Sequence, residues 1–328
     1  SITNGAGSSI ISINGGTLLV GAGNGSIDVD IVKLGAGCGV SGSHTLSGDG
    51  SITAGSEYIG DGGTGSFTQS GGTHDVTSGL YLGYLSNGNG SYTLTGGSLT
   101  AKAEYIGGLS TGSFTQSGGT HTVTDDLYLG YLSSGNGDYR LSGTGNLKAN
   151  YEYIGYDGSG SFTQSGGKHD VTSFLTLGKE TASVGSYELS NGSLTTYAEH
   201  IGYEGSGSFT QEGGMNTAYN ALVLGVESSG NGTYDLHGGE LWAMREFIGA
   251  NGTGTFNQDG VTHTVKNILN IVWNGTGTYN LSGGDLNTDI INATSTGAQF
   301  NFTGGTLAVN TYNGDLVNQG GTLIPGNS

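Results

Sequence analysis

The chain has 328 residues, of which 69 are glycine, one is proline and one is cysteine, and it carries 26 acidic against 8 basic residues. The net charge of −18 leaves no basic stripe for nucleic acid, and the singly scattered lysines and arginines disfavour an anionic membrane. No apolar run approaches the roughly 20 residues of a membrane-spanning helix. The 18 Tyr and 9 Phe indicate an ordered chain whose glycines mark turns.

Residues 1–43 are expected to form one or two irregular coils, because residues 10–20 already alternate like a strand. Within them Cys38 has no second cysteine to pair with. We expect a small apolar filler there, with an intermolecular disulfide or a reactive thiol as the alternative.

Residues 44–302 form a regular repeat. The Phe of a Gly-Ser-Phe-Thr-Gln motif (Gly-Thr-Phe-Asn-Gln at its last occurrence) returns in steps of 47, 48, 47 and 47 residues. These are Phe67, Phe114, Phe162, Phe209 and Phe256. A period this strict predicts a stack of small units that each rest on their neighbours.

Each period divides into two related halves, which begin with Phe in one half and mostly Tyr in the other. Every half contains three short runs with strand alternation, separated by Gly-Gly pairs or glycine-rich loops. The sequence therefore predicts an all-β fold, a single parallel β-solenoid with three short strands per coil of 21–25 residues and about 13 coils. A β-propeller is disfavoured, because its blade needs four dissimilar strands whereas the two halves are alike.

Alternation also places polar side chains inside the predicted coils. A Gln column, a His column and a Glu column each alternate with Leu from coil to coil. They comprise Gln69, Gln116, Gln164, Gln211 and Gln258; His74, His121, His169 and His263, with Asn216 replacing His once; and Glu57, Glu104, Glu152, Glu199 and Glu246.

Two interpretations of these columns compete. As a functional set, His and Glu would be acid–base pairs or metal ligands. As a structural set, Gln and His would bond to turn carbonyls or to each other, and Glu would reach water at a corner. Recurrence at every second coil favours the structural set, because the alternation with Leu would penalise a slip by one coil.

A further column points outward. Tyrosine fills it on five successive coils, as Tyr58, Tyr81, Tyr105, Tyr128 and Tyr153. The column is a candidate stabilising ladder, a candidate lateral protein contact or a candidate surface for stacking carbohydrate.

Sequence motifs for catalysis are missing. The chain has no phosphate-binding Gly-x-x-x-x-Gly-Lys-Ser/Thr loop, no His-Glu-x-x-His, no Gly-x-Ser-x-Gly and no repeated calcium nonapeptide. No coil concentrates the acids that a polysaccharide-degrading solenoid needs. We therefore expect no enzyme activity, cofactor or metal, with polysaccharide degradation as the least favoured alternative.

Residues 303–328 are expected to form a last coil. Its closing Gly-Gly-Thr-Leu-Ile-Pro-Gly-Asn-Ser, residues 320–328, resembles the Gly-Gly-Thr-Leu-x-Pro-Gly-Asn-Ser signature of passenger-associated transport repeats. These occur in bacterial autotransporter passenger domains, which the Gly-Ser-Phe-Thr-Gln-Ser-Gly-Gly repeats also resemble. The resemblance implies a right-handed β-helix at the bacterial cell surface or outside the cell. The sequence stops at the signature, and the membrane-anchoring half of an autotransporter is not among its residues.

Open solenoid edges favour stacking of further copies, since an edge strand recruits another strand; the alternative is that the sequence is a fragment of a longer solenoid whose caps lie outside it. We therefore expect a non-enzymatic structural protein that self-assembles head to tail into a surface filament or matrix fibre. The alternative is an adhesin that binds glycan or a host surface through its tyrosine column.

Overall fold

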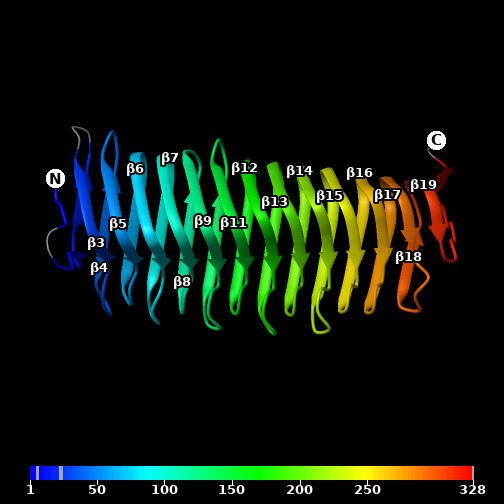
Figure 1. The fold of residues 1–328 in the computed structure, drawn as a ribbon, viewed down its shortest axis with the longest axis horizontal. Helices are drawn as coiled ribbons and strands as arrows, with labels where there is room; N and C mark the ends of the chain where they lie inside the picture. The colour runs from blue at the N-terminus through cyan, green and yellow to red at the C-terminus, as the bar shows by residue number, and fades with distance from the viewer. Residues whose placement is uncertain (5–6, 22–24, 327–328) are drawn as a thin grey trace. The chain divides into compact units, whose positions relative to one another are not determined.

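The computed structural model describes residues 1–4, 7–21 and 25–326. The described chain is all-β and contains no helix, and its parallel strands wind into a β-solenoid of about 13 turns with roughly three strands per coil (Figure 1). The predicted fold class is confirmed. Asn327 and Ser328 of the closing signature lie outside the described residues.

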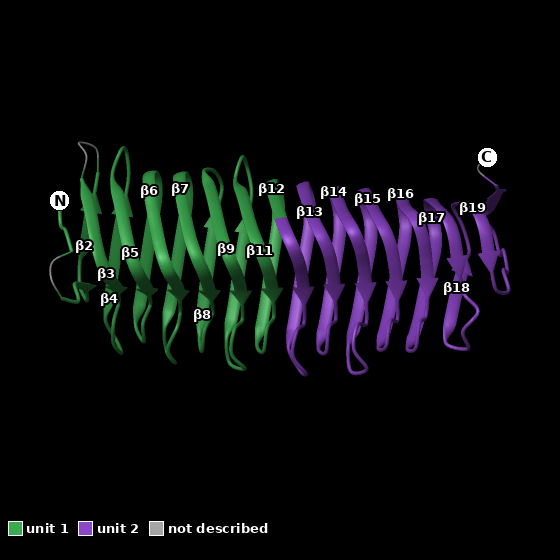
Figure 2. Ribbon diagram, in the orientation of Figure 1, with its two compact units in different colours: residues 1–170 green, residues 171–328 purple. Residues whose placement is uncertain are grey.

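The solenoid divides into two compact units, Ser1–Asp170 and Val171–Ser328 (Figure 2). The strands of the first unit are β1 (Ile10–Ile13), β2 (Thr17–Val20), β3 (Ser26–Leu34), β4 (Ser41–Leu46), β5 (Ser51–Ile59), β6 (Thr64–Leu82), β7 (Asn89–Ile106), β8 (Thr111–Gln116), β9 (Thr120–Leu129), β10 (Asn136–Leu141) and β11 (Asn146–Ile154). Strand β12 (Ser159–Leu177) runs from the first unit into the second. The second unit continues with β13 (Val184–Ile201), β14 (Ser206–Leu224), β15 (Asn231–Ile248), β16 (Thr253–Ile271), β17 (Thr276–Asn292), β18 (Ala298–Phe302), β19 (Thr306–Asn313) and β20 (Thr322–Pro325).

In many coils the three predicted runs are three faces of one long strand. Strand β6, for example, has 19 residues and bends through register shifts at Gln69/Ser70 and Val76/Gly79 instead of breaking. Gly72 makes the sharp corner, with φ 69°. A Cβ atom there would lie 2.2 Å from the carbonyl oxygen of Gly50, so only glycine fits.

Stacked aromatic rings form the centre of each unit. In unit 1 the ladder register joins Phe67 to Tyr92 and Tyr92 to Phe114, and their ring centroids lie 4.6 and 4.8 Å apart with nearly parallel planes. In unit 2 the Phe209–Tyr234 rings repeat this stack at 4.6 Å. All these rings are buried, so the column supplies much of the apolar area that drives folding.

Candidate functional site

All nine predicted Gln and His residues are buried in the core, on β6, β8, β9, β12, β14 and β16. They are Gln69, Gln116, Gln164, Gln211, Gln258, His74, His121, His169 and His263. Each lies beside the aromatic column, and the ring of His74, for example, stacks on Phe67 with centroids 4.8 Å apart.

Four side chains from three successive coils meet around His74. Its Nε2 lies 2.8 Å from Oε2 of Glu57 on β5, and its Nδ1 lies 2.9 Å from the hydroxyl of Tyr92 on β7. The Tyr92 hydroxyl donates a 2.6 Å hydrogen bond to Oε1 of Gln69. Gln69 donates from Nε2 to the carbonyl oxygen of Ser98 at 2.9 Å. We call this Glu–His–Tyr–Gln group a tetrad; it ties β5, β6 and β7 together.

Hydrogen-bond balance fixes most of the protons in a tetrad. Because the Gln69 amide uses its NH₂ on a carbonyl, its Oε1 must accept the only proton of the Tyr92 hydroxyl. His74 Nδ1 must therefore be the N–H that donates to the Tyr92 oxygen. His74 Nε2 and Glu57 Oε2 lie 2.8 Å apart without the alignment of a hydrogen bond, and one of them must carry a proton, since two lone pairs at that distance would repel.

The same arrangement recurs in both units. In unit 1, His121 lies 2.9 Å from Glu104 and 2.9 Å from the Tyr139 hydroxyl. In unit 2, His263 lies 3.3 Å from Glu246 and 2.8 Å from the Tyr279 hydroxyl. The tetrads are Glu57–His74–Tyr92–Gln69, Glu104–His121–Tyr139–Gln116 and Glu246–His263–Tyr279–Gln258, and the Glu152–His169 pair adds a contact of 2.7 Å.

The Asn216 coil supports this assignment of donors. Asn216 Nδ2, which can only donate, lies 3.1 Å from the Tyr234 hydroxyl in the place of a histidine Nδ1. The hydroxyl again donates to a glutamine, Gln211, at 2.5 Å. Asn216 Nδ2 also contacts Oε2 of Glu199 at 3.2 Å.

The expectation that the Glu column reaches water is wrong. Glu57, Glu104, Glu152, Glu199 and Glu246 are all 0% exposed. In the three tetrads the carboxyl group turns inward because the histidine of the next coil offers a partner, whereas a water-facing corner would leave that histidine nitrogen unpaired.

Burial decides the protonation of the pair in unit 2. Desolvation raises the pKa of Glu246 well above its ordinary value and lowers the pKa of His263 to about 3. Both directions put the shared proton on the carboxyl group and leave the tetrad uncharged. Since the four side chains are buried, no substrate reaches them, and the tetrad is a cross-link between coils.

Sequence reasoning missed the tyrosines of the tetrads. It treated Phe and Tyr as one aromatic column, although Tyr92, Tyr139, Tyr234 and Tyr279 each provide the hydroxyl that joins the imidazole or amide to the glutamine. The signal was available, because from Phe67 to Tyr279 the Leu/Glu coils have Tyr and the Gln-containing coils have Phe, in alternation.

The outward tyrosine column lies on the surface of unit 1. Tyr58, Tyr81, Tyr105, Tyr128 and Tyr153 are half-buried and stack with centroids 4.7, 4.8, 5.1 and 5.1 Å apart and planes within 11° of parallel. Each inner ring of the column therefore has both faces covered by its neighbours.

A second tyrosine row runs beside this column. Tyr84, Tyr131 and Tyr156 follow the glycine that ends the third face of their coils, and they are half-buried. Their planes stand 62–89° from those of the column, at centroid distances of 4.8–5.6 Å. We call the eight residues together the tyrosine face.

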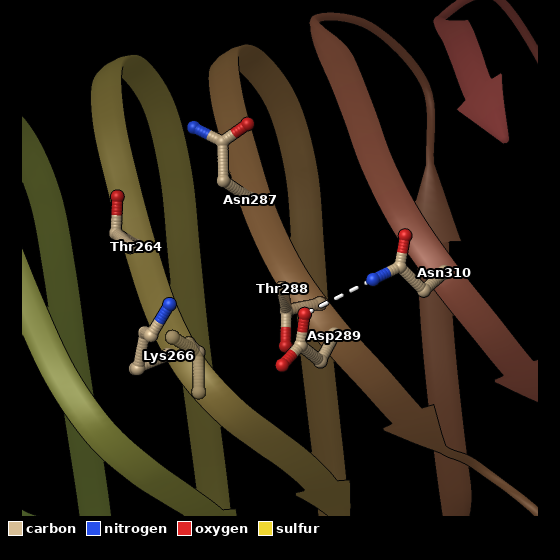
Figure 3. Close-up of a pocket in the computed structure, with 7 residues that line it drawn as sticks. Thr264, Lys266, Asn287, Thr288, Asp289 and Asn310 are labelled. Carbon is tan, nitrogen blue, oxygen red and sulfur yellow. Dashed lines mark hydrogen bonds between the residues drawn. The ribbon is translucent and has the colours of Figure 1, made fainter. Parts of the chain in front are cut away.

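A polar hollow of about 130 Å³ lies on unit 2 between the coils of β16, β17 and β19 (Figure 3). Thr264, Lys266, Asn287 and Thr288 line it, and Asn310 donates a 3.0 Å hydrogen bond to Asp289 across it. Its lining contains neither histidine nor cysteine.

Cys38 is exposed, so the expectation of an apolar filler at this position is wrong. Across residues 1–4, 7–21 and 25–326, no group of three or more His, Cys, Asp or Glu could hold a metal ion. The described part of the chain also has no helix that is long and apolar enough to cross a membrane.

Comparison with known proteins gives no relative. No protein family matches the chain, and neither a curated protein nor a solved structure is significantly similar to it.

Proposed function

We propose that this protein is a non-enzymatic, extracellular structural protein whose solenoids associate end to end into a filament or matrix fibre. The observation that carries the proposal is the state of the solenoid edges. Among the described residues, β1 and β2 each have one ladder partner, β3 and β4, and β20 pairs only with β19. An edge strand with a free row of N–H and C=O groups is a template for another strand.

Exposed apolar side chains accompany these strands. Ile10 on β1 is 57% exposed and Leu19 on β2 is 68% exposed. Leu323 and Ile324 on β20 are exposed as well. A contact between the two different edges is heterologous, so it continues from copy to copy without closing.

The ladders also suggest a register for the contact. Ser12 pairs with Lys33, and Lys33 pairs with Tyr58, so Ser12 lies at the first position of the outward column. At the other end of that column, Asn313 follows Asn270 and Asn292. That row is an amide ladder in which each Nδ2 donates to the preceding Oδ1, at 2.9 and 2.6 Å. Ser12 of a second copy could donate to Oδ1 of Asn313, pairing residues 311–313 with residues 10–12, if Ile2, which bridges Ile27, yields its ladder position to Leu323 of the first copy.

The extracellular part of the proposal rests on composition and resemblance. The chain is glycine-rich, acidic and nearly free of cysteine, and its repeats resemble those of autotransporter passengers. The geometry of the tyrosine column does not favour the glycan-binding alternative, because the inner rings cover each other's faces and a sugar stacks on an open ring face.

Electron microscopy and light scattering of the purified chain test the proposal. Because each copy carries a charge of −18, the experiment belongs at an ionic strength of about 0.15 M or higher, where the Debye length is about 8 Å. We expect filaments that lengthen with protein concentration.

The matched variants are Ile10→Lys and Leu85→Lys. Ile10 lies on the edge strand, whereas Leu85 lies in a turn between two internal coils and is comparably exposed, at 43%. Ile10→Lys should give single particles and Leu85→Lys should still give filaments. Dispersed wild-type particles at high concentration, or equal loss in both variants, would refute end-to-end association.

A further inference from the structure

The tyrosine face of unit 1 has ring surfaces of two kinds. The column Tyr58, Tyr81, Tyr105, Tyr128 and Tyr153 presents mainly ring edges, because its faces are stacked. The second row, Tyr84, Tyr131 and Tyr156, is turned 62–89° from the column, and within it Tyr131 and Tyr156 stack on each other with centroids 5.5 Å apart. A half-exposed phenol ring face attracts cations through its quadrupole.

Lysine already occupies both rows elsewhere in the same fold. In the column position, Lys33 is paired with Tyr58 in the ladder register, and its Nζ lies 4.9 Å from the Tyr58 ring centroid. In the second-row position of unit 2, Lys179 follows the glycine that ends one coil and Tyr203 follows the glycine that ends the next. Lys179 Nζ lies 3.6 Å from the Tyr203 ring centroid. Both rows therefore accept an ammonium group next to a tyrosine.

Within the second row of unit 1, the coil between Tyr84 and Tyr131 supplies no side chain. Gly108, which is buried, follows the coil-ending glycine there and packs against the Tyr84 backbone, since a Cβ at this position would lie 2.9 Å from the Tyr84 carbonyl oxygen. The neighbouring column adds negative charge, since the Tyr128 hydroxyl donates to Oδ2 of Asp126 at 3.0 Å. The second row therefore lacks one side chain between Tyr84 and Tyr131.

From this arrangement we propose that the tyrosine face of unit 1 binds a basic, lysine- or arginine-rich segment of a partner protein through cation–π contacts. Charge complementarity selects this occupant. A second copy of the chain also carries −18 and has only 8 scattered basic residues, so like charges oppose a face-to-face pair. A neutral glycan would leave the charge of Asp126 unused.

Isothermal titration calorimetry with an oligolysine peptide tests the proposal, with oligoglutamate as the ligand of opposite charge. The protein is the full chain carrying Ile10→Lys, so that end-to-end association does not contribute to the heat. The proposal is therefore tested independently of the proposed filament. We expect oligolysine to bind and oligoglutamate not to bind.

Two triple variants separate cation–π binding from general attraction to an acidic protein. Tyr84→Leu/Tyr131→Leu/Tyr156→Leu removes three ring quadrupoles and should weaken oligolysine binding about tenfold or more. Tyr84→Phe/Tyr131→Phe/Tyr156→Phe keeps the rings and should stay within about threefold of the parent. Circular dichroism checks that both variants fold.

The outcomes decide the proposal. An affinity unchanged by the leucine substitutions would mean that oligolysine binds by net charge alone, and it would overturn the proposal. Equal loss in the leucine and phenylalanine variants would overturn it too, because the hydroxyl groups would then be the binding groups.

Discussion

The Glu246–His263 pair should make the stability of unit 2 depend on pH in a defined window. In the folded protein the Glu246 carboxyl group and the His263 imidazole together hold one titratable proton. The reason is that burial raises the pKa of Glu246 and lowers the pKa of His263 to about 3. The count would be the same if the proton moved to the imidazole as an ion pair. In the unfolded chain the two groups return to ordinary pKa values of 4.5 and 6.5.

The sign follows from counting protons in the two states. Below pH 4.5 the unfolded pair holds two protons against one, so stability rises with pH from about 3 to 4.5. From 4.5 to 6.5 both states hold one proton, and stability is level. Above 6.5 the unfolded pair holds none, so stability falls by about 1.4 kcal/mol per pH unit. The loss continues until the pH reaches the raised pKa of Glu246.

Urea unfolding followed by circular dichroism from pH 3.5 to 8.5 measures this profile. The control is the double variant Glu246→Leu/His263→Leu, which places at both positions the residue that the neighbouring coils use, Leu269 and Leu241. The free energy of unfolding of the wild type minus that of the control isolates the pair from every other titrating group. We expect this difference to be level from pH 4.5 to 6.5 and to fall as the pH rises above 6.5.

A difference that stays constant from pH 6.5 to 8.5 would refute the reasoning, because the folded pair would then hold no proton above pH 6.5. The single variants provide a second check. His263→Leu alone should cost more than the double variant, since it leaves the buried Glu246 without its partner.

Three further substitutions test other parts of the core. Tyr139→Phe removes the hydroxyl that joins His121 to Gln116 and should lower the free energy of unfolding in urea by about 1–3 kcal/mol. The control Tyr131→Phe on the tyrosine face should lower it by less than about 0.5 kcal/mol, and equal losses would contradict the tetrad. Burial raises the pKa of Glu199 to about 7, so the stability that this group contributes is complete below pH 4.5 and is lost as the pH rises to 7. The variant Glu199→Gln should abolish that loss of about 3 kcal/mol, and an unchanged pH profile of the variant would count against the raised pKa. His44 is buried, and neither of its ring nitrogens has a hydrogen-bond partner in the described residues. The variant His44→Phe extends the aromatic stack on Phe67 and should raise the thermal midpoint of unfolding. A lower midpoint would show that the site is too tight for the larger ring.

The coil and its register could be predicted from the sequence because both rest on local patterns. Alternation identified the inward faces, and equal spacing aligned Phe67 with Tyr92 and Tyr92 with Phe114, as the ladders do. Gly-Gly pairs marked the corners, since a corner such as Gly72 leaves no room for a Cβ.

The partners of the buried polar groups were not predictable in the same way. Alternation says that a side chain points inward but not which coil it reaches, and Glu57 crosses to the histidine of the next coil. The orientation of the tyrosine rings could not be predicted from the alternation pattern either. The sequence predicted the outward column Tyr58 to Tyr153, but the covering of one ring face by the next depends on side-chain torsions that spacing does not determine.

The double period can be tested by deleting coils inside unit 1. Thr64, Asn89 and Thr111 occupy the same ladder position on three successive coils. Deleting residues 90–111 therefore removes one coil, and deleting residues 65–111 removes two.

The one-coil deletion brings two Gln/His coils together. Gln69 and His74 lose the Tyr92 hydroxyl, and His121 loses Glu104, which leaves buried polar groups without partners. The two-coil deletion instead places Glu57 directly before the coil of His121, in the role of Glu104. Each unpaired buried group costs about 1–3 kcal/mol, so the shorter deletion should destabilise the protein more than the longer one. Urea unfolding of both variants makes the comparison. If stability simply declined with the number of coils removed, the tetrads would not set the period, and the alternation of Gln and His with Leu would need another cause.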